Sequence, residues 1–133
     1  MKKVLCAVLV VLAVAGCAFA KDFTAEAQDA GARRRVWAEA APEMSAAFGA
    51  LGKAVLKDGA ISLKQKELIA VALSVQNRCE MCIMAHVQNA IRAGVTREEL
   101  VEALEVCVLM GGGPNQSFAS IALEVFDQFS AKK

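Results

Sequence analysis

Two cysteines and a histidine are spaced so that they can carry out thiol–disulfide chemistry. Cys79 and Cys82 form a C-x-x-C pair, and His86, the only histidine, follows four residues later. On a helix that begins at the cysteines, Cys82 and His86 lie on one face, one turn apart. The N–H groups and the dipole at the start of such a helix favour a thiolate. One thiolate can attack a disulfide or a peroxide, and the second sulfur can then resolve the intermediate.

Glu67 lies twelve residues before Cys79, near the start of the preceding predicted helix. If the two helices form a hairpin, we expect Glu67 to approach the cysteines and His86. His86 can then take and return a thiol proton, while Glu67 orients the imidazole or relays the proton. Because Cys79 is nearest to the helix N-terminus, it is predicted to be the more exposed thiol.

Two other interpretations of these residues remain open. In an exported protein, the C-x-x-C pair can be a structural disulfide in a helical binding or assembly module without catalytic activity. Alternatively, Cys79, Cys82 and His86 bind zinc. Glu67 or Cys107 would then supply the fourth ligand, although the second ligand pair usual in such sites is missing. Cys107 lies in an apolar stretch and is interpreted as a buried, inert thiol.

Residues 1–20 have the pattern of a secretory signal peptide. Two lysines precede an unbroken apolar run from Val4 to Ala15, and the segment ends in Ala18-Phe19-Ala20. The run is shorter than the span of about 20 apolar residues that a membrane helix needs. A competing interpretation is lipid anchoring through Cys17, because Val14-Ala15-Gly16-Cys17 resembles a bacterial lipobox. We expect export to the bacterial periplasm, with 1–20 cleaved and 21–133 forming one domain.

The predicted signal segment distorts the overall composition. The full chain has a formal charge of +1 and five cysteines, but two of the lysines and two of the cysteines lie in residues 1–20. The rest is close to neutral and has no general electrostatic attraction to nucleic acid, so no nucleic-acid partner is expected. The five cysteines of the full chain are too few for a disulfide-stapled miniprotein. With 56% hydrophobic and 22% charged residues in the full chain, disorder is not expected.

Residues 21–133 are predicted to be all-α, with about six helices. Alanine is abundant, and no stretch shows convincing strand alternation. Capping boxes at Ser62 and Thr96 mark two helix starts, and the Gly111–Pro114 run stops a helix. The expected helices cover 22–40, 42 to the Asp58-Gly59 stop, about 63 to 75 or 76, the C-x-x-C pair to just before Gly94, Thr96 to just before the 111–114 run, and about 115–129.

Apolar side chains recur at helical spacing in the first two predicted helices, and we expect these faces to be buried. They consist of Phe23, Ala27, Ala30 and Val36 or Trp37 in the first helix, and of Met44, Ala47, Phe48, Leu51 and Val55 in the second.

The arrangement of the four candidate residues resembles that of the AhpD-like, carboxymuconolactone decarboxylase superfamily. Its redox-active branch carries a Glu, an eleven-residue gap, C-x-x-C, three residues and a His, and this chain keeps that spacing. The stretches 94–100, 102–106 and 110–114 are also similar. The resemblance spans most of 44–129. The matching residues are Glu67, Cys79, Cys82 and His86.

This resemblance implies an all-α subunit that assembles as a homotrimer or homohexamer. It implies an alkylhydroperoxidase, or a disulfide reductase for a peroxiredoxin partner, acting on a hydroperoxide or a protein disulfide. Cys79 and Cys82 are then the redox pair, and Glu67 and His86 form a proton relay with water. No metal and no cofactor beyond the redox-active disulfide are expected. The decarboxylase branch lacks the C-x-x-C pair, so lactone decarboxylation is not expected.

Two features depart from the familiar members of the superfamily. Met81 stands where the best-known peroxidase has a histidine just before the second cysteine. The familiar members also act in the cytosol and draw electrons through lipoyl-protein partners. An exported member needs another thiol electron donor, for example a thioredoxin-like protein, or works as an oxidant or carrier of disulfides.

Overall fold

The computed structural model describes residues 21–131, so the predicted signal segment and the candidate lipobox at Cys17 lie outside the described residues. Within this range the chain forms five α-helices and no strand, which confirms the all-α prediction. None of the five combines the length and hydropathy that a bilayer span requires. The helices are α2 (Phe23–Ala40), α3 (Pro42–Val55), α4 (Leu63–Gln76), α5 (Glu80–Arg92) and α6 (Arg97–Ser130).

Side-chain caps fix the starts of α4 and α6. The Ser62 hydroxyl accepts a hydrogen bond from the backbone N–H of Gln65 at 3.2 Å, and Gln65 Oε1 accepts one from the N–H of Ser62 at 2.8 Å. Thr96 and Glu99 exchange the same pair of bonds, at 3.2 and 2.8 Å. Each box satisfies N–H groups that have no partner within the helix. Both predicted helix starts are confirmed.

The last two predicted helices are the two arms of α6, which bends at Gly112. This glycine has φ 65° and ψ −154°, a backbone conformation that residues other than glycine rarely adopt. Asn115, just past the bend, is buried and ties the arms to α4. Its Nδ2 donates to the carbonyl oxygen of Cys107 at 2.9 Å and to Oε1 of Gln76 at 2.5 Å.

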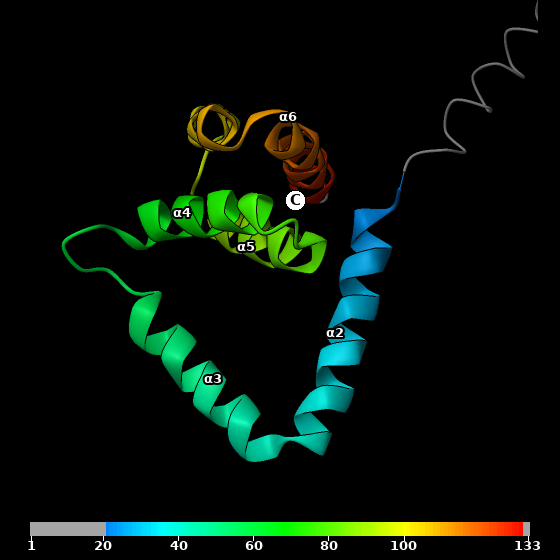
Figure 1. The fold of residues 1–133 in the computed structure, drawn as a ribbon. Helices are drawn as coiled ribbons and strands as arrows, with labels where there is room; N and C mark the ends of the chain where they lie inside the picture. Colours follow the sequence, from blue (N-terminus) through cyan, green and yellow to red (C-terminus); the bar gives the residue numbers. More distant parts are fainter. Residues whose placement is uncertain (1–20, 132–133) are drawn as a thin grey trace, which may run out of the picture.

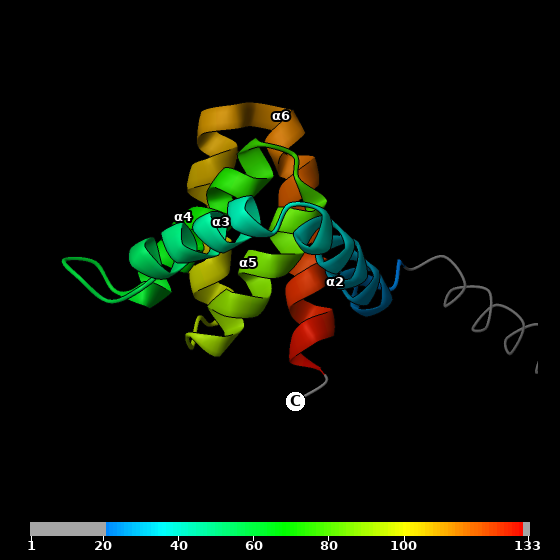
Figure 2. The same cartoon turned by 90° about the horizontal axis from the view of Figure 1, so that it is seen from below.

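The hydrophobic core lies where α4, α5 and the two arms of α6 pack together. Figures 1 and 2 show α6 on one side of the α4–α5 pair and α3 on the other. α2 adds Phe23 and Ala30, which are both buried as predicted. The largest fully buried apolar side chains are Ile83, Leu100, Val71, Val75, Val87 and Val125.

α3 contributes no buried side chain, and of the described helices only α2 packs closely against it. Figure 1 shows α2 and α3 meeting in an open V below α4 and α5. The expectation that the apolar face of α3 is buried within the chain is therefore wrong, as it is for the end of α2. Helical periodicity identifies an apolar face but not what covers it. The exposed side chains are Val36, Trp37, Met44, Phe48, Leu51 and Val55.

An ion pair joins the two ends of α6. Arg97 Nε lies 2.8 Å from Asp127 Oδ1, and Arg97 Nη2 lies 3.1 Å from Asp127 Oδ2. The hydrogen bonds from Arg97 hold the pKa of the Asp127 carboxyl below its usual value. A carboxyl with a lowered folded pKa contributes stability above its unfolded pKa of about 3.9. That contribution is lost as the pH falls through the folded pKa.

We expect Arg97→Gln to lower the free energy of unfolding at pH 7 only slightly, because exposed ion pairs are screened by water. Both side chains are half exposed. The difference from wild type should shrink below about pH 4 as Asp127 is protonated. Urea unfolding at pH 7 and pH 3 measures this, with Arg35→Gln as the control. If Arg97→Gln lowers the free energy of unfolding by the same amount at pH 7 and pH 3, the ion pair with Asp127 is not the cause of the loss.

Candidate active site

The turn between α4 and α5 places both cysteines at the start of α5. The N–H of Arg78 donates to the carbonyl oxygen of Val75, and that of Cys79 donates to the carbonyl oxygen of Ser74, both at 3.0 Å. This is the Schellman arrangement, with Arg78 in the left-handed conformation at φ 54°. Cys79 then serves as the N-cap of α5. The predicted position of the pair at a helix N-terminus is confirmed.

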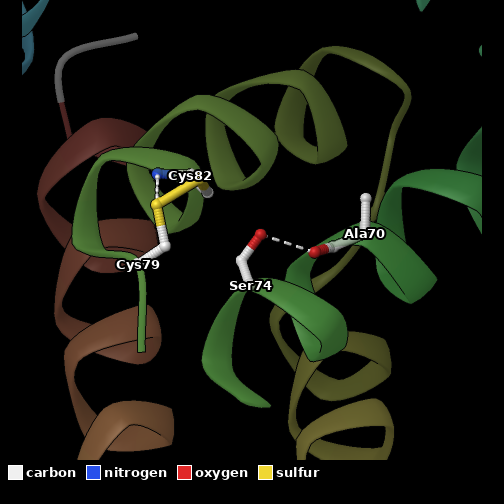
Figure 3. Close-up of a disulfide and its surroundings, with 4 residues drawn as sticks. All are labelled: Ala70, Ser74, Cys79 and Cys82. Carbon is white, nitrogen blue, oxygen red and sulfur yellow. Dashed lines mark hydrogen bonds between the residues drawn. A yellow bond between two sulfur atoms is a disulfide. The ribbon is translucent and has the colours of Figure 1, made fainter. Parts of the chain in front are cut away.

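Cys79 and Cys82 form a disulfide, with their Cα atoms 5.2 Å apart. Figure 3 shows it beside the last turns of α4. The backbone N–H of Cys82 donates to Cys79 Sγ at 3.3 Å. Once the disulfide is reduced, this N–H and the helix dipole stabilise a negative charge on the sulfur of Cys79.

The relative exposure of the two cysteines is the reverse of the prediction. Cys82 is exposed, whereas Cys79 is half-buried. Because Cys79 caps α5, its sulfur is held against the first turn of the helix by the N–H of Cys82. Position at a helix N-terminus therefore predicts which sulfur is stabilised as a thiolate, but not which cysteine is the more exposed.

Glu67 and His86 meet across the α4–α5 contact, as the hairpin interpretation predicts. His86 Nδ1 lies 2.8 Å from Glu67 Oε2. The Glu67 side chain is only 3% exposed, whereas that of His86 is 29% exposed. Since a buried carboxylate needs a hydrogen-bonding partner, His86 stabilises Glu67, and Glu67 in turn fixes the orientation of the imidazole. His86 also lies one turn beyond Cys82 on the same face of α5.

An ion pair that the sequence does not indicate lies beside the disulfide. Lys21, just before α2, pairs with Glu80, which follows Cys79 in α5. The hydrogen bond to Glu80 raises the pKa of Lys21 above its usual value. The pairing offsets the negative charge of Glu80, which would otherwise disfavour a thiolate next to it. Local spacing gives no signal for this contact, since the residues lie far apart in the chain.

Cys107 is a buried free thiol, as predicted, and lies between α6 and α4. Its Sγ donates to the carbonyl oxygen of Ala72 at 3.2 Å and accepts from Nδ2 of Asn115 at 3.3 Å. Across residues 21–131, no group of three or more His, Cys, Asp or Glu side chains is arranged to hold a metal ion.

Glu67 also lines a cavity of about 370 Å³ between α3, α4 and α5. Asn89 and Arg92 of α5 and Lys53 of α3 line it as well. Asn89 lies on the α5 face of Cys82 and His86, so helical spacing alone could have identified it. The contribution of Lys53 depends on the position of α3, which the sequence does not predict.

The relationship to known proteins agrees with this geometry. A sequence model of the carboxymuconolactone decarboxylase family matches residues 42–125. The chain belongs to this family. The carboxymuconolactone decarboxylase family includes decarboxylases and peroxidase-like members, so membership alone does not assign an activity.

Two relatives of uncharacterised function share much of the sequence. A protein of Cupriavidus necator is 44% identical over 93 residues, which are 70% of this chain and 82% of the relative. Uncharacterised protein 4 of the cox locus of Paracoccus denitrificans is 43% identical over 82 residues, or 62% of this chain and 74% of the relative.

Two solved structures of the family share the fold. The apo structure of a Legionella pneumophila member has a TM-score of 0.79 and 42% identity, and covers 81% of this chain and 96% of its own. A Thermotoga maritima member, for which a part in an antioxidative response is suggested, has a TM-score of 0.68 and 25% identity. That match covers 77% of this chain and 91% of the other.

Proposed function

We propose that this protein is an exported thiol-dependent oxidoreductase that reduces hydroperoxides or protein disulfides through Cys79 and Cys82. One observation carries the proposal. Cys82, the more exposed cysteine of the pair, lies one helical turn from an imidazole that is hydrogen-bonded to a buried carboxylate. A purely structural disulfide needs neither an exposed cysteine nor the His86–Glu67 pair.

In the reduced protein, His86 takes the proton of the Cys82 thiol, and the thiolate attacks the terminal oxygen of a hydroperoxide. The O–O bond breaks, the alcohol leaves with the proton returned by His86, and Cys82 becomes a sulfenic acid. Cys79 then attacks the Cys82 sulfur and forms the disulfide. The hydroxyl group leaves as water with the proton of Cys79. Glu67 holds the imidazole in one orientation throughout.

The disulfide is reduced again by a dithiol donor, whose first thiolate attacks Cys82 and forms a mixed disulfide. The donor's second thiol then closes the donor's own disulfide and releases the Cys82 thiolate. Cys79 leaves in the first of these steps as a thiolate, which the N–H of Cys82 stabilises, and a more stable leaving thiolate departs faster. With a protein disulfide as substrate, the reduced pair takes the same steps in reverse. An exported protein would draw these electrons from a thioredoxin-like dithiol donor.

Stopped-flow consumption of a hydroperoxide by the reduced protein tests this function. We expect two thiols to disappear for each cumene hydroperoxide reduced, with Cys107 still titratable after denaturation. Insulin disulfides serve as the parallel substrate for the disulfide-reductase reaction. If the reduced protein consumes neither substrate faster than dithiothreitol alone, the proposed function is wrong.

We further propose that the chain assembles as a homotrimer or homohexamer through α3. Four large apolar side chains on one face of α3 are exposed, with Phe48 at 72%. Soluble monomers rarely expose a contiguous apolar surface of this kind, and a helix so loosely held gains stability when a second surface covers it.

Replacing Phe48 with glutamate should dissociate the assembly, because it puts a charge into the centre of the apolar face. Light scattering coupled to size exclusion measures the mass. Ala46→Glu is the matched control, since Ala46 lies on the opposite side of α3 and is exposed. A monomeric wild type, or a Phe48→Glu variant with wild-type mass, would contradict the proposed interface.

A further inference from the structure

We propose that the cavity between α3, α4 and α5 binds the carboxylate of a linear carboxylic acid hydroperoxide, whose reactive end reaches Cys82. The proposal rests on the function proposed above and names the substrate class of that site. The cavity is lined by Glu67 and by the part of α5 that follows His86, and the reaction steps proposed above do not use it. Four observations support it: the charges at the cavity, its apolar walls, its position on α5, and its loosely packed wall.

The basic side chains of the cavity are available for an anion. Lys53 and Arg92 are both exposed and line the cavity. Neither has an ion-pair partner among residues 21–131. The carboxylate that lines the cavity, Glu67, is already paired with His86. A guanidinium binds a carboxylate through two parallel hydrogen bonds, and an ammonium adds a point charge, so the pair suits a carboxylate.

These two cations also have a purely structural interpretation. Lys53 lies in the last turn of α3 and Arg92 in the last turn of α5, where a positive charge stabilises the helix dipole. That interpretation predicts a small loss of stability when either is neutralised. It does not account for their meeting at one cavity from two separate helices, and it predicts no effect on ligand binding.

The cavity has walls for an aliphatic chain next to these cations. Leu56 of the α3 C-cap and Leu63 of α4 line it, and both are partly buried. Their apolar surface favours hydrocarbon over water. Because α3 does not pack closely against α4 or α5, this wall can adjust to a ligand.

The position of the cavity along α5 sets the length of the ligand. Cys82, His86 and Asn89 recur at helical spacing on one face. With a rise of 1.5 Å per residue, Cys82 lies about 10 Å along the axis from Asn89 and about 15 Å from Arg92. An extended chain of roughly eight to twelve carbons spans this distance. The cavity ends at Glu67, which is hydrogen-bonded to His86, so a ligand whose carboxylate is held at Arg92 must extend past this pair to bring its far end near Cys82.

The reaction balances as for any hydroperoxide. The thiolate of Cys82 takes the terminal oxygen, the O–O bond breaks, and the hydroxy acid leaves with the proton from His86. Cys79 then closes the disulfide and water is released. The two electrons come from the cysteine pair, and the carboxylate is unchanged.

Binding of decanoate to the oxidised protein tests the site without turnover. In a titration followed by two-dimensional NMR, we expect saturable shifts at Asn89 and Arg92 in the wild-type protein. Lys53→Gln and Arg92→Gln should each raise the dissociation constant at least about tenfold, since each removes a charge from a partly desolvated carboxylate contact. Lys57→Gln, which removes a charge nearby without lining the cavity, should change it less than about twofold.

Turnover of a matched pair of probes tests whether the site serves catalysis. The probes are a ten-carbon hydroperoxy acid and its methyl ester, which differ only in charge. We expect the wild-type kcat/KM to favour the acid, and Arg92→Gln to lower the acid-to-ester ratio about tenfold. An unchanged acid-to-ester ratio overturns the proposal. A wild-type protein that does not bind decanoate also overturns it, as does a Lys57→Gln variant whose dissociation constant rises as much as that of Arg92→Gln. If neither probe is consumed, the proposed function fails, and decanoate binding alone decides whether the cavity is a carboxylate site.

Discussion

Cys82→Ser is expected to reduce the turnover of hydroperoxides and protein disulfides by at least about a thousandfold, because a serine hydroxyl provides neither a thiolate nor a disulfide partner. Cys79→Ser should also abolish continuous turnover, but for a different reason. It keeps Cys82, the more exposed cysteine, one helical turn from His86 and removes only the resolving sulfur. The two variants should therefore differ in a single-turnover experiment.

Mass spectrometry after one equivalent of hydroperoxide, with dimedone present to trap sulfenic acid, measures this difference. Cys79→Ser should carry one adduct at Cys82, and Cys82→Ser should carry none. Cys107→Ser is the control and should keep wild-type turnover, because serine can replace the buried hydrogen bonds to Ala72 and Asn115. An adduct only at Cys79 would reverse the roles of the two sulfurs, and continuous turnover in both variants would refute the redox role of the pair.

The second large effect is expected for Glu67→Gln, which keeps the shape of the side chain but removes its charge. Loss of a positioned proton-transfer group typically costs about 100-fold or more in rate. The Glu67 carboxylate is hydrogen-bonded to His86, so we regard it as a positioning residue that acts through the imidazole. The rate of attack by Cys82 should fall about 100-fold, while the amount of sulfenic acid trapped at completion stays the same.

Two comparisons separate this role from a merely structural one. Glu102→Gln changes an exposed glutamate of α6 and should leave the rate unaltered. Thermal unfolding of Glu67→Gln identifies any loss of folded protein, and the rate is then corrected for it. If Glu67→Gln reacts as fast as Glu102→Gln, the carboxylate contributes nothing to the reaction.

The helices and the pairing within the site could be predicted because local chemistry determines them. The hydroxyls of Ser62 and Thr96 satisfy N–H groups within their own first turns, so their positions in the sequence mark the helix starts. The contact between Glu67 and His86 required only that consecutive helices form a hairpin. In both cases the interacting residues lie either within about one helical turn of each other or on two consecutive helices.

Features that depend on three-dimensional position could not be predicted. The face of α3 around Phe48 has the periodicity of a buried helix, yet nothing in the described chain covers it. Lys21 reaches Glu80 only because α2 begins beside α5. Cys79 is less exposed than Cys82, and its sulfur is held against the first turn of α5 by the N–H of Cys82, a contact that the spacing of the two cysteines does not reveal.

The reduction potential of the Cys79–Cys82 disulfide, titrated against a glutathione or dithiothreitol buffer, tests the central claim most directly. An exchange-active pair should have a potential between roughly −270 and −120 mV, the range of thioredoxin-like catalysts. Hydroperoxide consumption, measured in the same samples, should rise with the reduced fraction. A potential below about −300 mV, together with no consumption by the reduced protein, would mean that the disulfide is structural and would contradict the proposed function.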